Sequence, residues 1–379
     1  MLVVRGRTAA GRRDRRPLLS TGDTVNGDNP VGGESASEEA PAEPGGGDDI
    51  LLSVRGLKKY FPVKQGVLRR TSGYLQAVDG VDLDVRRGET VGLVGESGCG
   101  KSTLSRTLLR LIEPTAGEIS FDGVDLVGLG ARDLKEMRRH MQIVFQDSVG
   151  SLDPRMTVGD LIGEGLAIHK LAGRKERDAI VHEMLERVGM PPEAAGRYPH
   201  QFSGGQRQRI GLARALVLQP KLVVADEPVS ALDVSIQSQV LNLLVELKRE
   251  FDLTYVFVAH DLAVVGYISD RVAVMYLGRI VEIAPSDELF ARPLHPYTMA
   301  LLSANPEPVP GRKSSRIVLT GDVPSPIDPP SGCRFRTRCP IAQQVCSEVD
   351  PPLQDHGADH RAACHFPGTS IAGSHAHTA

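Results

Sequence analysis

Short apolar runs and longer helical stripes alternate along the chain from residue 50 onward. Residues 50–61 alternate weakly between apolar and polar side chains, and similar runs after Gln76 end in an apolar stretch at Thr90–Val94. Alternation at a period of two predicts strands, and a short, wholly apolar run predicts a buried one. Further apolar runs predict strands at 140–146, Leu222–Ala225, Thr254–Ala259 and Val272–Leu277.

Helical periodicity fills the segments between these strands. The spacing predicts a helix over Ser203–Leu218, where Ser203 is a good N-cap and Pro220 stops the run. Other helices are predicted over Ser102–Ile112, over residues 157–190 with Arg177–Val188 as the clearest part, and over Ser235–Phe251. Strands that alternate with helices predict an α/β fold with a mainly parallel sheet covered on both faces.

The two ends of the chain lack these patterns. Residues 1–16 hold six arginines, and residues 17–49 hold eight acidic residues and no Lys or Arg among many Gly, Pro and Ser. Such segments bury too little apolar area to offset their ordering entropy, so we expect disordered tails at 1–49 and 367–379. Pro and Gly rise from Asn305 onward, which predicts a small, loop-rich C-terminal domain at 291–366 after a main domain at 50–290.

Composition narrows the class of protein. The chain has 379 residues, enough for two or three domains, and its 41% hydrophobic and 24% charged residues are ordinary for a soluble globular protein. It has neither an apolar run of about 18 residues nor the apolar core of a secretory signal in residues 1–20, so we expect a cytosolic protein. A net charge of −3, 4% aromatics and no Trp argue against nucleic acid as a partner.

A phosphate-binding loop is predicted between a strand and a helix. Residues 95–102 read GESGCGKS, which fits G-x-x-x-x-G-K-[ST] at every fixed position. The glycines let the backbone curl so that several N–H groups and a helix N-terminus converge on the phosphates. Lys101 can then reach the β- and γ-phosphates, and the Ser102 hydroxyl can bind Mg²⁺. The predicted ATP-binding residues here are Gly95, Glu96, Ser97, Gly98, Cys99 (a small filler rather than a nucleophile), Gly100, Lys101, Ser102 and Thr103.

Two carboxylates follow the apolar run at 222–225. Asp226 and Glu227 stand in LVVADEP at the C-terminal end of the predicted strand, where ligands bind in open α/β sheets. Asp226 suits a water-mediated contact to Mg²⁺, and Glu227 suits a general base that polarises the attacking water. An acidic pair after a strand is usually only a turn, and the phosphate loop upstream is what favours the catalytic interpretation.

Further motifs resemble those of ATP-binding-cassette (ABC) ATPases. Residues 202–206 read FSGGQ, the signature motif of that family, and they open a helix whose free N–H groups form an anion site with the Ser203 hydroxyl. The resemblance implies a P-loop, RecA-like core, an antiparallel β subdomain and a helical signature subdomain at about 147–207. It also identifies Gln146 (VFQD) as the Q-loop residue and a Mg²⁺ ligand, Asp233 (SALD) as part of the D-loop, His260 (VAHD) as the switch histidine and Tyr60 as the residue that stacks on adenine.

The same resemblance implies a dimer. In the family, two cassettes pack head to tail, and the signature motif of one completes the phosphate loop of the other. This chain has one phosphate loop and one signature motif, so it would be half of such a pair. The residues implied to meet the facing nucleotide are Ser203, Gly204, Gly205, Gln206 and Asp233, and the implied catalytic residues are Glu227, His260 and Gln146.

Longer segments resemble the F-type ATP-binding subunit of the oligopeptide and dipeptide importers. They include KKYFPVKQG, RYPHQFSGGQRQRIGLARAL and HPYTMALLSA. The resemblance implies an ATPase that energises peptide uptake at the cytoplasmic face of the cell membrane. Its implied partners are a D-type ATPase paralogue, two permease subunits and, indirectly, an extracytoplasmic solute-binding protein. The alternatives are a soluble cassette ATPase that acts on ribosomes or DNA, and an importer of another solute such as a nickel chelate or haem.

Four cysteines lie close together near the C-terminus. Cys333, Cys339, Cys346 and Cys364 have the spacing C-x5-C-x6-C-x17-C. In a cytosolic protein, such a group indicates a metal site before it indicates disulfides. Zinc sites usually contain closer cysteine pairs, and four thiolates also suit an iron–sulfur cluster. The tail resembles the importer C-terminal domain, some members of which carry a [4Fe–4S] cluster; zinc and free thiols remain the alternatives.

Overall fold

The computed structural model describes residues 49–65, 70–147, 150–304 and 317–371. The chain divides into two units between Asp49 and Ile50, and the elements below belong to the second unit. The predicted disorder of residues 1–48 and 372–379 lies outside the described residues. Ordered packing continues beyond the predicted end at residue 366, because Gly368 N–H donates to Leu294 O at 2.8 Å and Ile371 is buried.

The larger sheet is mixed. Five neighbouring strands run parallel in the order β9-β3-β8-β7-β6, and three more, β10, β12 and β11, extend one edge in antiparallel pairs. The parallel strands are wholly or largely apolar, as expected for strands covered on both faces. The eight strands of this sheet are β3 Thr90–Val94, β6 Met141–Val144, β7 Leu222–Asp226, β8 Thr254–Val258, β9 Arg271–Tyr276, β10 Arg279–Pro285, β11 Gln354–Asp355 and β12 Arg361–Ala362.

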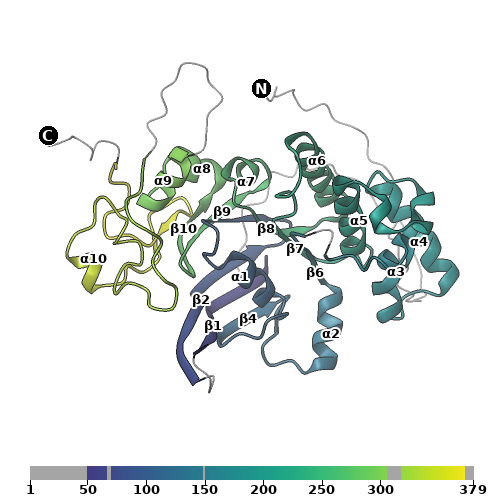
Figure 1. The fold of residues 1–379 in the computed structure, drawn as a ribbon, viewed down its shortest axis with the longest axis horizontal. Coiled ribbons are helices and arrows are strands. Elements are labelled where there is room, and N and C mark those ends of the chain that lie inside the picture. The colour runs from purple at the N-terminus through teal and green to yellow at the C-terminus, as the bar shows by residue number, and fades with distance from the viewer. Residues whose placement is uncertain (1–48, 66–69, 148–149, 305–316, 372–379) are drawn as a thin grey trace, which may run out of the picture. The chain divides into compact units, whose positions relative to one another are not determined.

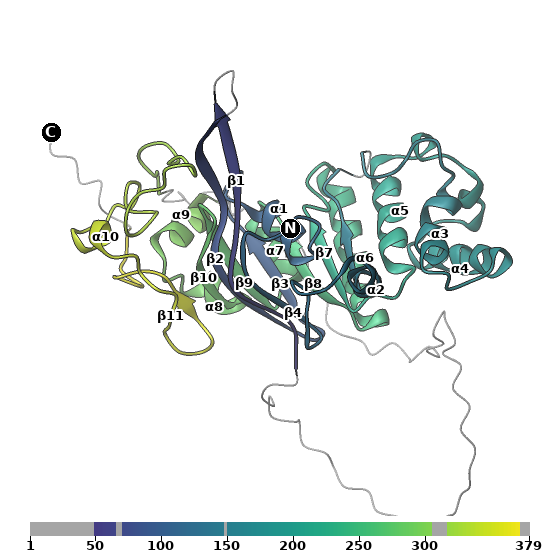
Figure 2. The same cartoon turned by 90° about the horizontal axis from the view of Figure 1, so that it is seen from below.

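A second, antiparallel sheet lies beside the first. Its order is β2-β1-β4-β5, with β1 Ile50–Gln65, β2 Arg70–Arg86, β4 Ala116–Phe121 and β5 Val124–Asp125. Strands β1 and β2 form a long antiparallel pair (Figure 2). One hydrophobic cluster contains side chains from both sheets and from α1, Lys101–Leu108. Helix α1 is therefore held in the shared core, which fixes the loop that precedes it.

One group of helices and the C-terminal segment lie at opposite edges of the larger sheet. A helical group next to the β6 edge contains α3 Val158–Ile168, α4 Arg174–Arg187 and α5 Gly204–Leu216, with the short turns Pro192–Gly196 and Pro199–Gln201 before α5 (Figure 1). The C-terminal segment with α10, Val345–Glu348, lies at the opposite edge. The remaining helices are α2 Ala131–Arg139, α6 Val234–Phe251, α7 Leu262–Ile268, α8 Ser286–Ala291 and α9 Pro296–Ala304.

A buried carboxylate joins the C-terminal segment to the larger sheet. Glu282 on β10 is fully buried and accepts hydrogen bonds from the N–H groups of Leu294 and His295 at 2.6 and 2.9 Å. It also pairs with Nε2 of buried His360 at 2.7 Å. Together with the β10–β12 pairing, these bonds place the cysteine-containing segment against the ATPase core, so the predicted boundary at residue 290 does not coincide with a break in the sheet.

Most predicted elements are present, with shifted ends. The predicted helix at 102–112 ends at Leu108, because Arg110 adopts a left-handed conformation with φ 50°. The predicted helical region 157–190 is two helices, interrupted where Lys170 has φ 55°. Ser203 caps α5 as predicted, and its hydroxyl accepts from Gln206 N–H. Among the described residues, no helix has the length and apolar character needed to cross a bilayer.

Candidate nucleotide site

The phosphate loop is shaped by glycines that no other residue could replace without strain. Gly98 and Gly100 have φ of 80° and 109°, in the left-handed region. A Cβ added to Gly100 would lie 2.0 Å from Ala77 O, and one added to Gly95 would lie 2.2 Å from Met275 O. The loop therefore packs its backbone directly against β2 and β9 before α1 begins at Lys101.

Lys101 and Cys99 occupy the inside of this loop. The Lys101 side chain is 5% exposed, and Nζ donates to the carbonyl oxygens of Gly95 at 2.8 Å and Glu96 at 3.2 Å. The ammonium group is thus held at the centre of the loop. Cys99 is buried, and burial raises the pKa of its thiol, which agrees with a filler rather than a nucleophile.

Ser102 and Asp226 meet beside the loop and fit a magnesium site. Ser102 Oγ donates to Asp226 Oδ1 at 2.9 Å. Asp226 is fully buried at the end of β7, and its Oδ2 has no hydrogen-bond partner within the described residues. Burial raises the pKa of Asp226. An unpaired buried carboxylate oxygen is costly unless a cation or water joins it, so this donor set matches the hard oxygen ligands of Mg²⁺.

The three predicted catalytic residues come together. Gln146 Nε2 donates to Glu227 Oε2 at 2.8 Å, and His260 Nδ1 lies 3.5 Å from the same oxygen. The Glu227 side chain is 15% exposed, whereas that of His260 is 59% exposed. Gln146 follows β6, Glu227 follows β7 and His260 follows β8, so the parallel strands deliver all three to one edge of the sheet. The amide of Gln146 thus orients a carboxylate that still reaches solvent.

Backbone strain accompanies this arrangement. Glu227 has φ 48°, a conformation that costs a non-glycine residue roughly 1–2 kcal/mol. Its N–H donates to Val258 O at 3.0 Å, and its carbonyl accepts from Ser230 N–H at 3.3 Å. These bonds hold the residue in the strained conformation that directs its side chain toward Gln146 and His260.

Tyr60 is tied to a buried carboxylate that the sequence did not single out. Its hydroxyl donates to Asp79, which is 5% exposed. Burial and the bond to Asp79 raise the pKa of Tyr60 to about 12. The backbone of Asp79 leads back to the phosphate loop, because Asp79 N–H donates to Gly278 O and Gly278 N–H donates to Cys99 O, both at 2.8 Å. A continuous chain of hydrogen bonds therefore joins Tyr60, the predicted adenine contact, to Cys99 in the phosphate loop.

The signature motif caps its own helix. Gln206 N–H donates to Ser203 Oγ at 3.3 Å, and Ser203 N–H donates to Gln206 Oε1 at 3.0 Å. The N–H groups of Gly204 and Gly205 precede the first helical bonds, as expected for an anion site. A Cβ on Gly205 would lie 2.5 Å from Ile236 Cγ2, so the glycine allows α5 to approach α6. Asp233 caps α6 through Ile236 N–H at 3.0 Å, and both caps are exposed.

The cysteine cluster does not form a recognisable metal site. Cys333, Cys339 and Cys364 are half-buried and Cys346 is buried. Burial raises the pKa of Cys339 and of Cys364 to about 11 in the metal-free protein. In the part of the chain that the structure describes, no group of three or more His, Cys, Asp or Glu side chains is arranged to hold a metal ion. The prediction of an iron–sulfur cluster, or of zinc, therefore finds no support here.

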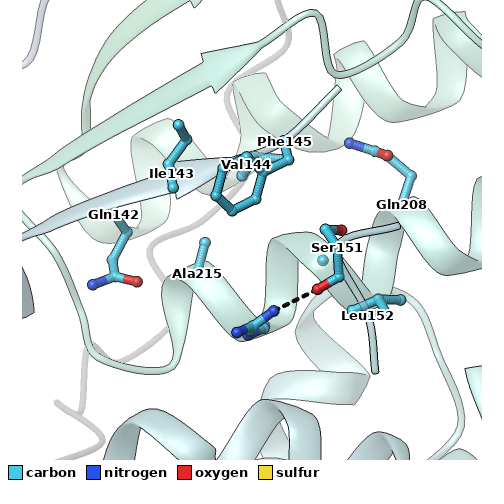
Figure 3. A pocket seen from close by; sticks show the side chains of 10 residues that line it. Gln142, Ile143, Val144, Phe145, Ser151, Leu152, Gln208 and Ala215 are labelled. Atoms are coloured by element: carbon cyan, nitrogen blue, oxygen red, sulfur yellow. Dashed lines mark hydrogen bonds between the residues drawn. The ribbon is translucent and has the colours of Figure 1, made fainter. Parts of the chain in front are cut away.

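A small cavity lies next to the Q-loop. It has a volume of about 120 Å³ and is lined by the end of β6, by Ser151 and Leu152, and by α5 (Figure 3). Arg214 donates to Ser151 O at 2.8 Å across one side of it. Gln208 is 2% exposed at its wall, and its Nε2 has no partner within the described residues. The cavity thus lies between the segment after Gln146 and the helix that the signature motif begins.

Several functional contacts were missed by sequence reasoning. Arg338 and Arg334, in the C-terminal segment, bind Glu96 and Asp79, and Tyr297 Oη accepts from Glu96 N–H at 2.8 Å. The only sequence signal was the three arginines in CRFRTRC, which stands more than 230 residues after the phosphate loop. Nothing in that spacing indicates which residues the two guanidinium groups bind.

Two family models match the chain. The ABC transporter model matches residues 78–230, and the model for the oligopeptide/dipeptide transporter C-terminal region matches residues 281–346. The oligopeptide transport ATP-binding protein AppF of Bacillus subtilis (strain 168) is 53% identical over 323 residues, which cover 84% of this chain and 98% of AppF. A protein of Brucella ovis called a putative peptide import ATP-binding protein is 55% identical over 314 residues, covering 83% of this chain and 97% of that protein.

Solved structures share the fold. The cbiO1 protein of Clostridium perfringens, part of the ABC transporter complex cbiONQ, has a TM-score of 0.55 and 29% identity over 64% of this chain and 91% of that chain. The ATP-binding cassette MJ0796, in a dimeric post-hydrolysis state with ADP and Pi, has a TM-score of 0.55 and 30% identity over 62% of this chain and 98% of that chain. Fold and site together define a P-loop ATPase with a signature helix. The chain belongs to the ABC transporter ATPases, in the branch that carries the oligopeptide/dipeptide transporter C-terminal region.

Proposed function

We propose that this protein is the ATP-hydrolysing subunit of an importer that takes up oligopeptides or dipeptides. The observation that carries the proposal is the 53% and 55% identity to relatives named for peptide import, over nearly their whole length. That similarity includes the C-terminal region as well as the ATPase core. The peptide itself would be selected by other subunits of the importer.

Glu227 would act as the general base. Its carboxylate is held by the Gln146 amide and faces His260, so one oxygen stays oriented while the site remains open to water. Glu227 would accept the proton of a water molecule as the water oxygen bonds to the γ-phosphorus and the bond to ADP breaks. His260 would contact the γ-phosphate from the exposed side of the same edge.

Lys101, Ser102 and Asp226 would receive the triphosphate and its cation. Magnesium, when bound, would neutralise negative charge on the β- and γ-phosphates. Ser102 Oγ would bind it, the unpaired Asp226 Oδ2 would contact it through water, and Gln146 is the further expected ligand. Lys101 Nζ, now bonded to two loop carbonyls, would exchange those bonds for phosphate oxygens.

A second ATPase subunit would complete the site, with a D-type paralogue as the expected partner. Ser203 and Asp233 are exposed at the N-termini of α5 and α6, where they can meet a facing nucleotide. The cassette MJ0796 is dimeric when bound to ADP and Pi. The α3–α5 group, with the cavity beside Phe145 and Gln208, would contact the permease subunits at the cytoplasmic face of the membrane.

The test is purification of the full chain from membranes, followed by reconstitution of the complex that accompanies it. We expect two permease proteins and a second ATPase subunit to co-purify, and we expect proteoliposomes to take up a labelled tripeptide only with ATP. The Glu227→Gln variant should abolish that uptake. Co-purification with ribosomes or DNA, or uptake of haem or a nickel chelate in place of peptides, would contradict the proposal.

A further inference from the structure

The phosphate loop contains an acidic residue where negative ligands are expected. Glu96 is the only carboxylate in GESGCGKS. A free carboxylate there would repel the triphosphate, because like charges close together are unfavourable. Some cation must therefore offset Glu96, and Lys101 does not, since its Nζ bonds backbone carbonyls of the loop instead.

Arg338 supplies that cation from the far end of the chain. Its two terminal nitrogens donate to the two Glu96 carboxylate oxygens at 2.8 and 3.0 Å, a bidentate pair. The Arg338 side chain is 9% exposed and that of Glu96 is 28% exposed. Water therefore weakens the attraction between the two charges less than it does in a fully exposed ion pair. Hydrogen bonding to Glu96 raises the pKa of Arg338, and the guanidinium keeps its charge.

Buried aromatic rings hold Arg338 in this position. Its guanidinium lies 5.9 Å from the centroid of the Tyr276 ring. Tyr276, Tyr297 and Phe335 form a cluster with centroid separations of 4.7, 5.2 and 5.4 Å, and each ring is at most 1% exposed. Tyr297 Oη also accepts from Glu96 N–H, so Glu96 is held through its backbone as well as its side chain.

Arg334, four residues earlier, makes the equivalent contact on the predicted adenine side. It donates to Asp79, which accepts the hydroxyl of Tyr60, and to Gln76 Oε1 at 2.7 Å. Arg279 donates to the same Asp79 oxygen at 2.8 Å. Burial works against the charge on Asp79, but the bonds from Tyr60 and Arg279 hold its pKa below the usual value. The carboxylate is thus fully engaged.

We propose that the segment Cys333–Cys339 is a positioning element of the nucleotide site, in which Arg338 neutralises and orients Glu96 of the phosphate loop and Arg334 orients Tyr60 through Asp79. The C-terminal region then contributes to ATP affinity without touching ATP. The effect of Arg338 on the KM for ATP can be measured only if the proposed ATPase function is correct. Its effect on the Kd for nucleotide can be measured without hydrolysis.

The test compares Arg338→Met with Arg336→Met in the full-length protein. Arg336 lies in the same segment, but within the described residues its side chain donates hydrogen bonds only to Ser331, so its replacement should leave nucleotide binding unchanged. In Arg338→Met we expect the Kd for a fluorescent ATP analogue, and the KM for ATP, to rise about tenfold while kcat changes about twofold at most. Lys101→Ala marks the complete loss of binding.

A second variant separates neutralisation from simple folding damage. Glu96→Gln combined with Arg338→Met removes the repelling carboxylate, so we expect it to recover most of the affinity that Arg338→Met loses. A KM and Kd for Arg338→Met equal to those of Arg336→Met, or a double variant as weak as the single one, would overturn the proposal. If the wild type binds nucleotide but never hydrolyses it, the ATPase function fails and the Kd comparison still decides the role of Arg338.

Discussion

Glu227, the predicted general base, shows how the structure holds a single residue in one geometry. Its backbone is strained, its N–H is bonded to β8, and its carboxylate is bonded to Gln146. Strain of this kind persists only where surrounding contacts over-determine the conformation, and it commonly marks functional positions. The residue is therefore the most informative one to change.

We expect Glu227→Gln to lower kcat for ATP hydrolysis about 100-fold or more, because the amide cannot accept the proton of the attacking water. ATP binding should be retained, since Lys101 and Ser102 are unaffected. Measurement of steady-state hydrolysis together with nucleotide binding separates the two effects. Glu246→Gln, an exposed change on α6, is the matched control, and near-normal turnover in Glu227→Gln would show that another group is the base.

A second residue-scale prediction concerns two loop glycines that look equivalent in sequence. Gly98 has open space around its would-be Cβ, whereas that of Gly100 would lie 2.0 Å from Ala77 O. We expect Gly98→Ala to lower the free energy of unfolding by only the left-handed backbone cost, about 1–2 kcal/mol. Gly100→Ala should cost more than about 3 kcal/mol because the backbone must also shift. Chemical denaturation of both variants checks the difference, and equal losses would contradict it.

At the scale of elements, α5 combines a local cap with an expected contact to a second subunit. Ser203 both begins the helix and presents its hydroxyl to solvent. A cap can be explained by the isolated helix alone, so the two roles require variants that separate them.

We expect Ser203→Ala to lower the free energy of unfolding by about 1 kcal/mol through loss of the cap. Ser203→Asp should keep wild-type stability, since Asp caps as well as Ser, yet it should abolish ATP hydrolysis by placing a negative charge against the facing nucleotide. Thermal unfolding and hydrolysis assays read the two effects. Full hydrolysis in Ser203→Asp would mean that the signature motif serves only as a cap.

At the scale of the whole molecule, the C-terminal segment is packed into the ATPase core through buried polar groups. His295 is 1% exposed beside Phe335, and its Nδ1 accepts from Tyr297 N–H at 3.0 Å. Burial lowers the pKa of His295 to about 4, although nearby Glu282 acts in the opposite direction. A proton on the ring would have to displace the hydrogen bond that positions α9.

Stability should therefore fall in acid. Between about pH 6.5 and pH 4 the unfolded chain binds a proton at His295 that the folded chain excludes, so this residue contributes a loss of about 2 kcal/mol by pH 5. We expect the difference in free energy of unfolding between the wild type and His295→Gln to shrink by that amount from pH 7.5 to pH 5. His182→Gln, an exposed change on α4, should show no such trend, and parallel pH profiles for wild type and His295→Gln would refute the assignment.

Motifs whose chemistry requires contiguous residues were predictable. The phosphate loop, the Asp226–Glu227 pair and the capped signature helix depend on local spacing, because the backbone between neighbouring residues limits where their side chains can go. Helix ends and strand lengths were less accurate, as at Leu108, since the terminating conformation of Arg110 depends on its bonds to the loop after β5. The ABC transporter family membership followed from the motifs and is confirmed by the matches.

The sequence by itself determined that this protein is an ABC ATPase, and it predicted which loop and which carboxylates form the nucleotide site, because each of those motifs lies within a short segment. Only the tertiary structure decided that Glu96 is neutralised by Arg338, 242 residues later, and that Asp79 joins Tyr60 to Arg334, 255 residues after it. Ion pairs between residues so far apart in the chain produce no pattern in the sequence from which the two partners could be predicted. They arise because β12 joins β10 and buried aromatic rings bring the C-terminal segment against the phosphate loop.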